Sequence, residues 1–63
     1  MKMITLHDHL NPDQEVLVDA DSITSVVPFG SGAAVQCGGG LVGVHENPQE
    51  VEEAIQNAQD YPL

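Results

Sequence analysis

Positive charge is the property that this sequence most clearly lacks. One lysine (Lys2) and no arginine stand against ten Asp and Glu residues, so the 63-residue chain has a formal net charge of -9. Proteins bind nucleic acids and anionic membranes largely through Lys and Arg placed near phosphates. We therefore expect no direct nucleic-acid or membrane binding. A basic protein partner, a cation or an uncharged ligand would fit this charge, and solubility alone would also account for it.

Cysteines and large aromatic side chains are also scarce. Cys37 is alone, which excludes a disulfide within the chain, and Phe29 and Tyr61 are the aromatic residues. A domain of this size buries only about 60% of the surface that its unfolded chain exposes. Such a core rarely supplies more than about 3–5 kcal/mol without a further stabilising device. Self-association is the expected device, so we predict a homo-oligomer, a dimer or higher.

Long apolar runs are missing as well. No segment approaches the roughly 20 apolar residues that span a bilayer, and the N-terminal residues show no secretory signal pattern. A lone cysteine fits a reducing compartment. These features predict a cytoplasmic protein.

What the sequence does contain is a series of short strand patterns separated by turn residues. Alternating apolar residues and β-branched residues predict strands over 1–6, 15–19, 23–27, 33–37 and 41–46. Proline, glycine and Asx residues predict turns over 7–14, 28–32 and 38–40. Asp21 is expected to cap a short turn after the second strand. Within the fourth strand, Ala33, Val35 and Cys37 are expected inward and Ala34 outward, and Gly43 indicates a bulge or a close backbone approach.

A helix is predicted over about 47–59. Asn47 is a favourable N-cap, Pro48 suits the first helical position, and Glu50 stands three residues after the cap, as in a capping box. The apolar stripe of the helix has helical spacing and consists of Val51, Ala54, Ile55 and Ala58. The expected fold is mainly β (α+β). It is a single domain over 1–63 with about five short antiparallel strands, in a small sheet or a partly open barrel, closed by this amphipathic helix.

These patterns resemble a known family. Residues 3–6 (Met-Ile-Thr-Leu), the run from Val16 to Ile23, the glycine turn at 38–40 and the segment from Val42 to Val51 are similar to the FlbD/SwrD-type flagellar and swarming motility proteins. The resemblance covers roughly residues 3–56. It departs from the family at the long 7–14 segment and in the small-residue strand at 32–35. It implies a non-catalytic accessory or regulatory role, and similar short proteins are encoded by phages.

A second resemblance is to the carbon storage regulator, an intertwined β-dimer with a C-terminal helix. The segment from Val42 to Ile55 carries this likeness. Glu46 and Glu50 occupy the region where that protein grips RNA with basic residues, so RNA binding is not implied. The resemblance supports only a strand-exchanged dimer.

Candidate chemical groups are few. His7 and His9 lie two residues apart and could form a zinc site with His45, but zinc sites usually show Cys and His pairs at fixed spacing, and a solvated turn fits better. Cys37 has no nearby cation to activate it and fits a small core residue. The glutamates at the helix start are typical of capping and solvation. We therefore predict no enzyme, no catalytic residue, no metal and no cofactor.

The expected function is a small acidic interaction module that binds a protein partner. The candidate partner or ligand contacts combine an aromatic glycine loop with carboxylates near the helix, and they are Phe29, Gly30, Ser31, Glu46, Glu50 and Glu53. The alternative is a phage-encoded inhibitor of a host defence or regulatory system. It would act as an acidic mimic of nucleic acid, or by sequestering a small ligand between subunits in the cytosol of the infected host.

Overall fold

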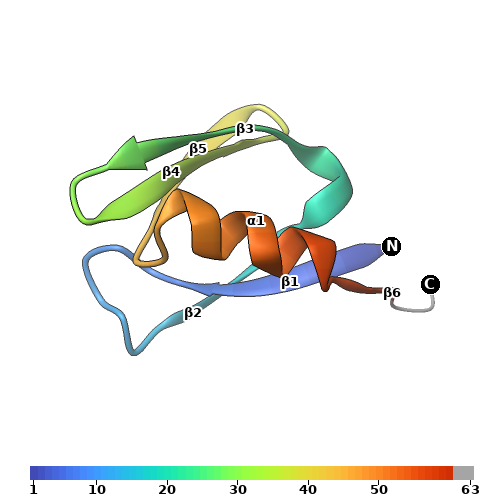
Figure 1. Cartoon of the computed structure of the whole chain (residues 1–63), viewed down its shortest axis with the longest axis horizontal. Helices are drawn as coiled ribbons and strands as arrows, with labels where there is room; N and C mark the ends of the chain where they lie inside the picture. Colours follow the sequence, from blue (N-terminus) through green and yellow to red (C-terminus); the bar gives the residue numbers. More distant parts are fainter. Residues whose placement is uncertain (61–63) are drawn as a thin grey trace.

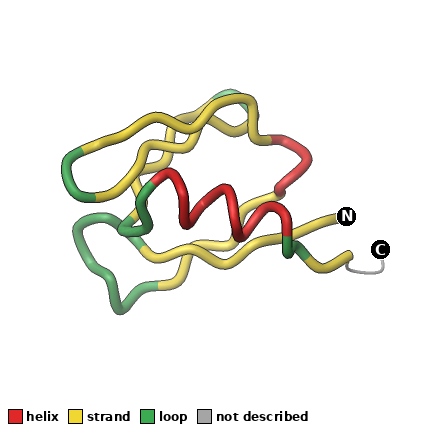
Figure 2. The backbone as a smooth tube through the Cα atoms, in the orientation of Figure 1, coloured by secondary structure: helices red, strands yellow, loops and turns green. Residues whose placement is uncertain are grey.

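The computed structural model describes residues 1–60 and shows two small antiparallel sheets with one helix between them (Figures 1 and 2). The elements in chain order are β1 (Lys2–His7), β2 (Glu15–Asp19), the 3-10 turn η1 (Ala20–Ser22), β3 (Ile23–Phe29), β4 (Gly32–Cys37), β5 (Gly40–Val44), α1 (Pro48–Gln56) and β6 (Gln59–Asp60). The strand orders are β2-β1-β6 and β3-β4-β5. The mainly β fold with a C-terminal helix is confirmed. Over the described residues both sheets are open, and they do not form a closed barrel.

The core lies where the two sheets and α1 meet. It is entirely aliphatic and consists of Ile4, Leu6, Val18, Ala33, Val35, Val44 and Val51. The predicted inward orientation of Ala33, Val35 and Cys37 is confirmed. The predicted helix stripe is confirmed as well, because Val51 belongs to the core and the other three stripe residues pack against it. The helix and the strands contribute only aliphatic side chains to it, and among the residues that the structure describes none of the buried ones is polar.

The two sheets are joined where the chain leaves β1. Asp8 forms an isolated antiparallel bridge with Val44. On either side of it, the N–H of His45 donates to the carbonyl of His7 at 2.7 Å and the N–H of His9 donates to that of Gly43 at 3.3 Å. Residues 7–9 therefore run beside the end of β5. This junction extends the surface of the β3-β4-β5 sheet as far as His9.

The helix begins as predicted but ends earlier. Asn47 is its N-cap, and it forms a full capping box with Glu50. The helix stops at Gln56 rather than near residue 59, with Asn57 as its C-cap. The next residues instead pair with β1 as β6, Lys2 with Asp60 and Met3 with Gln59. Strand pairing has replaced the last helical turn. Residues 61–63, which include Tyr61, lie outside the described residues.

Two turn predictions need correction. The 28–32 loop is mostly strand, because Pro28 pairs with Ala33 and Phe29 with Gly32, which leaves a two-residue turn at 30–31. Pro28 is tolerated there because β3 is an edge strand. Asp19, not Asp21, caps the η1 turn, through its carboxylate accepting from the N–H of Asp21 at 3.0 Å.

Strand irregularity also lies elsewhere than predicted. Gly43 keeps a regular register, and its neighbours are the His9 and Phe29 side chains at ordinary contact distances; the register shift occurs instead between Ile23 and Ser25. In the 38–40 turn, Gly38 has a φ of 59° and Gly40 already belongs to β5, which stops at Val44. Within the described residues, no helix has the length and apolar character to cross a membrane.

Candidate functional site

Over the described residues, the face of the β3-β4-β5 sheet turned away from α1 is an apolar surface that the fold leaves uncovered. Strand register places on it Ser25, Val27, Phe29, Gly32, Ala34, Gln36, Leu41 and Gly43. We call this set the outer face. None of these residues is charged, and Val27, Phe29 and Leu41 are large apolar side chains that remain exposed. A surface of this kind on a chain of net charge -9 is a marked exception to its acidic character.

A small, covered residue lies at the centre of the outer face. Ala34 pairs with Val27 on one side and with Gly43 on the other, and it is only 6% exposed although the register turns it away from the core. Phe29, which is 52% exposed, and Leu41, which is 69% exposed, stand on the same face in the neighbouring pairs of the register.

Phe29 and His9 form one rim of the outer face. Their ring centroids lie 4.9 Å apart at an interplanar angle of 54°, within the range of favourable tilted ring pairs. A Cβ placed on Gly43 would lie 3.5 Å from the His9 Cβ and 3.8 Å from a Phe29 ring carbon. Gly43 therefore forms the floor between the two rings. The His9 Nδ1 atom is buried without a hydrogen-bond partner, so packing rather than a polar contact holds this ring.

An open pocket of about 320 Å³ lies beside this pair, lined by Asp8, His9, Leu10, Phe29 and Gly43. Leu10 is a nearly fully exposed side chain at its edge. The Asp8 carboxylate is already engaged, because it accepts from the backbone N–H groups of Leu10 and Asn11 at 3.1 and 3.0 Å. The pocket thus continues the outer face and offers chiefly apolar contacts.

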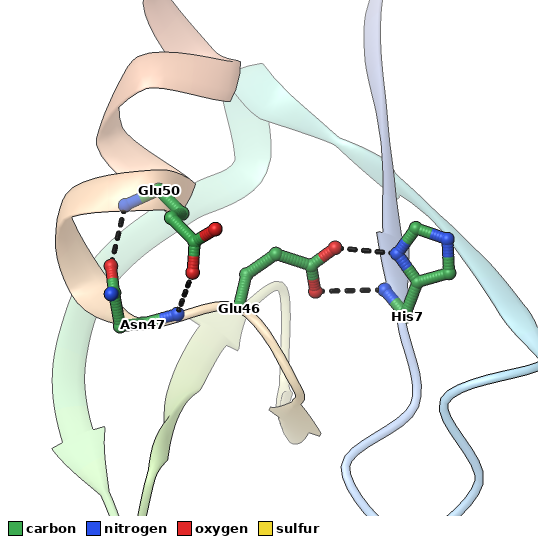
Figure 3. Close-up of polar contacts among 4 residues, drawn as sticks. All are labelled: His7, Glu46, Asn47 and Glu50. Atoms are coloured by element: carbon green, nitrogen blue, oxygen red, sulfur yellow. Dashed lines mark hydrogen bonds and ion pairs between the residues drawn. The ribbon is translucent and has the colours of Figure 1, made fainter.

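A hydrogen-bonded pair, His7 and Glu46, ties the end of β1 to the segment before α1 (Figure 3). The Glu46 carboxylate accepts from the backbone N–H of His7 at 2.9 Å and lies 2.6 Å from its ring Nδ1. Since a carboxylate can only accept, Nδ1 carries the proton in this pair. The contact joins residues 39 positions apart in sequence. It fastens the same junction that aligns His9 with β5.

This pair shifts both ionisations. The hydrogen bond to Glu46 raises the pKa of His7 above its ordinary value of 6.5 and outweighs the opposing effect of desolvation. Burial raises the pKa of Glu46. The hydrogen bonds from the His7 ring and backbone together lower it by more than burial raises it, so the pKa lies below its ordinary value of 4.5. The charged pair is therefore the favoured state over the interval between these two values.

The predicted contact residues fall in different places. Phe29 lies on the outer face and Gly30 and Ser31 form the adjacent turn. Glu46 is only 16% exposed and is held by His7. Glu50 serves the capping box, in which its carboxylate accepts from the N–H of Asn47 at 3.0 Å. Glu53 is exposed on α1, away from Phe29. The structure thus separates the aromatic contact from the acidic ones.

Sequence reasoning missed the other members of the outer face. The sequence pattern predicts Val27 and Leu41 only as strand residues, and His9 only as a turn residue or zinc ligand. The signal was present in part, because Val27 and Phe29 alternate with inward residues of the same strand. What was lacking is the register, since only the pairing of β3 with β4 and β5 shows that Leu41 shares a face with Val27.

The other candidate groups are dispersed. Over residues 1–60 no cluster of three or more His, Cys, Asp or Glu residues could hold a metal ion; His7 turns to Glu46 and His9 to Phe29. Cys37 is half-buried and packs against the core.

Comparisons with family models, curated proteins and solved structures find no match to this chain. The resemblance to FlbD/SwrD-type proteins, with the motility or phage role that it implies, stays a prediction from the sequence.

Proposed function

We propose that this chain is a non-enzymatic interaction module that binds a protein partner through the outer face. The observation that carries the proposal is the exposure of Val27, Phe29 and Leu41 around the small residues Ala34 and Gly43. Exposed aromatic and aliphatic side chains grouped on one surface are characteristic of protein-binding sites. The proposal keeps Phe29 as a contact residue and replaces the carboxylates of the helix with apolar neighbours from β3 and β5.

The geometry supports a rigid recognition surface. The outer face is built on paired strands rather than on a long loop, and Phe29 is braced by the His9 ring. A surface already ordered before binding loses little conformational entropy when it docks. The pocket beside Phe29 and Gly43 gives a partner side chain a place to insert, as central binding residues commonly do.

Photo-crosslinking from a single position tests the proposal. A photoreactive phenylalanine analogue replaces Leu41 on the outer face or, as the matched control, Leu17 on β2; these leucines are 69% and 60% exposed. After irradiation in the native host, we expect a protein adduct from position 41 and none from position 17. Adducts of equal yield from both positions, or from position 17 alone, would exclude the outer face as the binding surface.

A further inference from the structure

We infer that the partner seated on the outer face is a second copy of this chain, packed face to face about a two-fold axis. This inference rests on the proposed function and names the partner. In such an interface the same patch serves both subunits, so it must be complementary to itself in charge and in shape. The outer face meets both conditions.

The charge condition is the more restrictive. Two copies of net charge -9 repel each other, and Lys2 is the one side chain with a fixed positive charge. Copies can therefore meet closely only through a surface without carboxylates. The outer face is such a surface, whereas the exposed face of α1 carries Glu50, Glu52 and Glu53. A basic protein partner would instead be drawn to those carboxylates, which the outer face does not contain.

The shape condition is met because the outer face carries both protruding and small side chains. Leu41 stands exposed on β5, and on the same face the next pair of residues along β4 and β5 is the small pair Ala34 and Gly43. When two such faces meet in reverse orientation, each Leu41 packs toward the small residues of the other copy. This reciprocal contact satisfies the symmetry that a two-fold axis requires.

The alternative apolar surface for self-association is already used within the chain. In the helix stripe, Val51 is fully buried and Ala54 and Ile55 pack against the core. The strand before the helix, β5, keeps Leu41 exposed. The structure therefore favours the sheet over the helix as the contact between copies.

The size of the surface sets the expected strength. Three strands of about six residues cover a footprint of roughly 14 by 20 Å, well below the ~800 Å² per partner of a standard stable interface. We therefore expect a weak dimer with a dissociation constant of about 1 μM or higher. Burial of apolar surface drives dimer formation, and charge repulsion between the copies opposes it. Added salt screens that repulsion and should therefore strengthen the dimer.

Sedimentation velocity on the purified chain tests the inference. We expect a concentration-dependent species of twice the 6.7 kDa chain mass, more abundant at about 0.5 M than at about 0.05 M NaCl. Leu41→Glu should weaken the dimer at least about tenfold, because it removes an apolar contact and places two like charges in the interface. The matched control Leu17→Glu adds the same charge elsewhere and should weaken the dimer by no more than about twofold.

Gly43→Ala serves as a second variant that leaves the fold intact. The added Cβ meets its neighbours at ordinary contact distances of 3.5 Å and more, so it adds bulk to the outer face without straining the sheet. It should also weaken the dimer. A monomer at all concentrations, a dimer that salt weakens, or a dimer insensitive to Leu41→Glu and Gly43→Ala would overturn the inference. If position 41 still crosslinks to a different protein, the proposed function stands and only the identity of the partner fails.

Discussion

At the scale of single residues, Gly32 is the position where the backbone leaves least room for a side chain. A Cβ at this residue would lie 2.1 Å from the carbonyl oxygen of Val44 and 3.0 Å from that of His45. Gly32→Ala must therefore displace the backbone at the β4–β5 pairing, at a cost of about 1–3 kcal/mol. Urea unfolding measures this loss. Gly39→Ala is the control, since a Cβ there meets nothing within 4 Å, and equal stabilities of the two variants would show that this crowding is relieved without cost.

The His7–Glu46 pair gives stability a dependence on pH. The raised pKa of His7 means that its contribution is complete below 6.5 and is lost as pH rises through the higher folded value. The lowered pKa of Glu46 means that its contribution is complete above 4.5 and is lost as pH falls through the lower folded value. The pair is therefore most stabilising between 4.5 and 6.5.

Glu46→Gln tests this dependence. Wild type should lose more stability than the variant between about pH 5.5 and about pH 8.5, because only wild type loses a charged pair over that range. Urea unfolding at both values gives the comparison, and an NMR titration should show the His7 pKa falling in the variant. If wild type and variant lose the same stability, the effect belongs to the overall net charge rather than to this pair.

Residue-level prediction from the sequence succeeded for local features and failed for contacts distant along the chain. Asn47 and Glu50 stand three residues apart, so their capping box could be predicted from spacing alone. His7 and Glu46 lie on different elements, and nothing in the spacing relates them. The pairing of His9 with Phe29 was hidden for the same reason.

At the scale of elements, the start of α1 depends on the reciprocal capping by Asn47 and Glu50 (Figure 3). Asn47→Ala removes the oxygen that accepts from the N–H of Glu50 at 2.8 Å. We expect it to lower the free energy of unfolding by about 1 kcal/mol. Asn47→Asp keeps an accepting oxygen and should retain most of that stability. Equal losses in the two variants, measured by urea unfolding, would mean that the cap contributes little to the stability of the helix.

The ends of the elements were harder to predict than their existence. The helix pattern continues to Ala58, yet residues 59–60 pair with β1 instead. Pro28 and Gly30 read as a loop, yet Pro28 is accommodated on the free edge of β3. In both cases tertiary pairing overrides the local preference, and that pairing depends on which strand is adjacent. The number and order of the five main strands needed no such knowledge.

At the scale of the whole molecule, the chain distributes its two kinds of surface unevenly. Carboxylates occupy the exposed face of α1, while the outer face of the β3-β4-β5 sheet is uncharged and apolar. The core of one copy is small and aliphatic. A second copy packed over Ala34 and Gly43 would bury additional apolar surface and so add to the stability of the fold. Composition alone predicts self-association, and the sheet register favours the outer face as the surface that our proposal assigns to it.

The central claim is that the chain meets other proteins through the outer face, and a crosslinking scan around the molecule tests it most directly. The photoreactive residue is placed in turn at Val27 and Leu41 on the outer face, at Leu17 on β2 and at Glu53 on α1; all four side chains are exposed. Our account predicts protein adducts from positions 27 and 41 and none from positions 17 and 53. Adducts from position 53 without any from 27 or 41 would contradict it and would place the binding surface on the acidic helix.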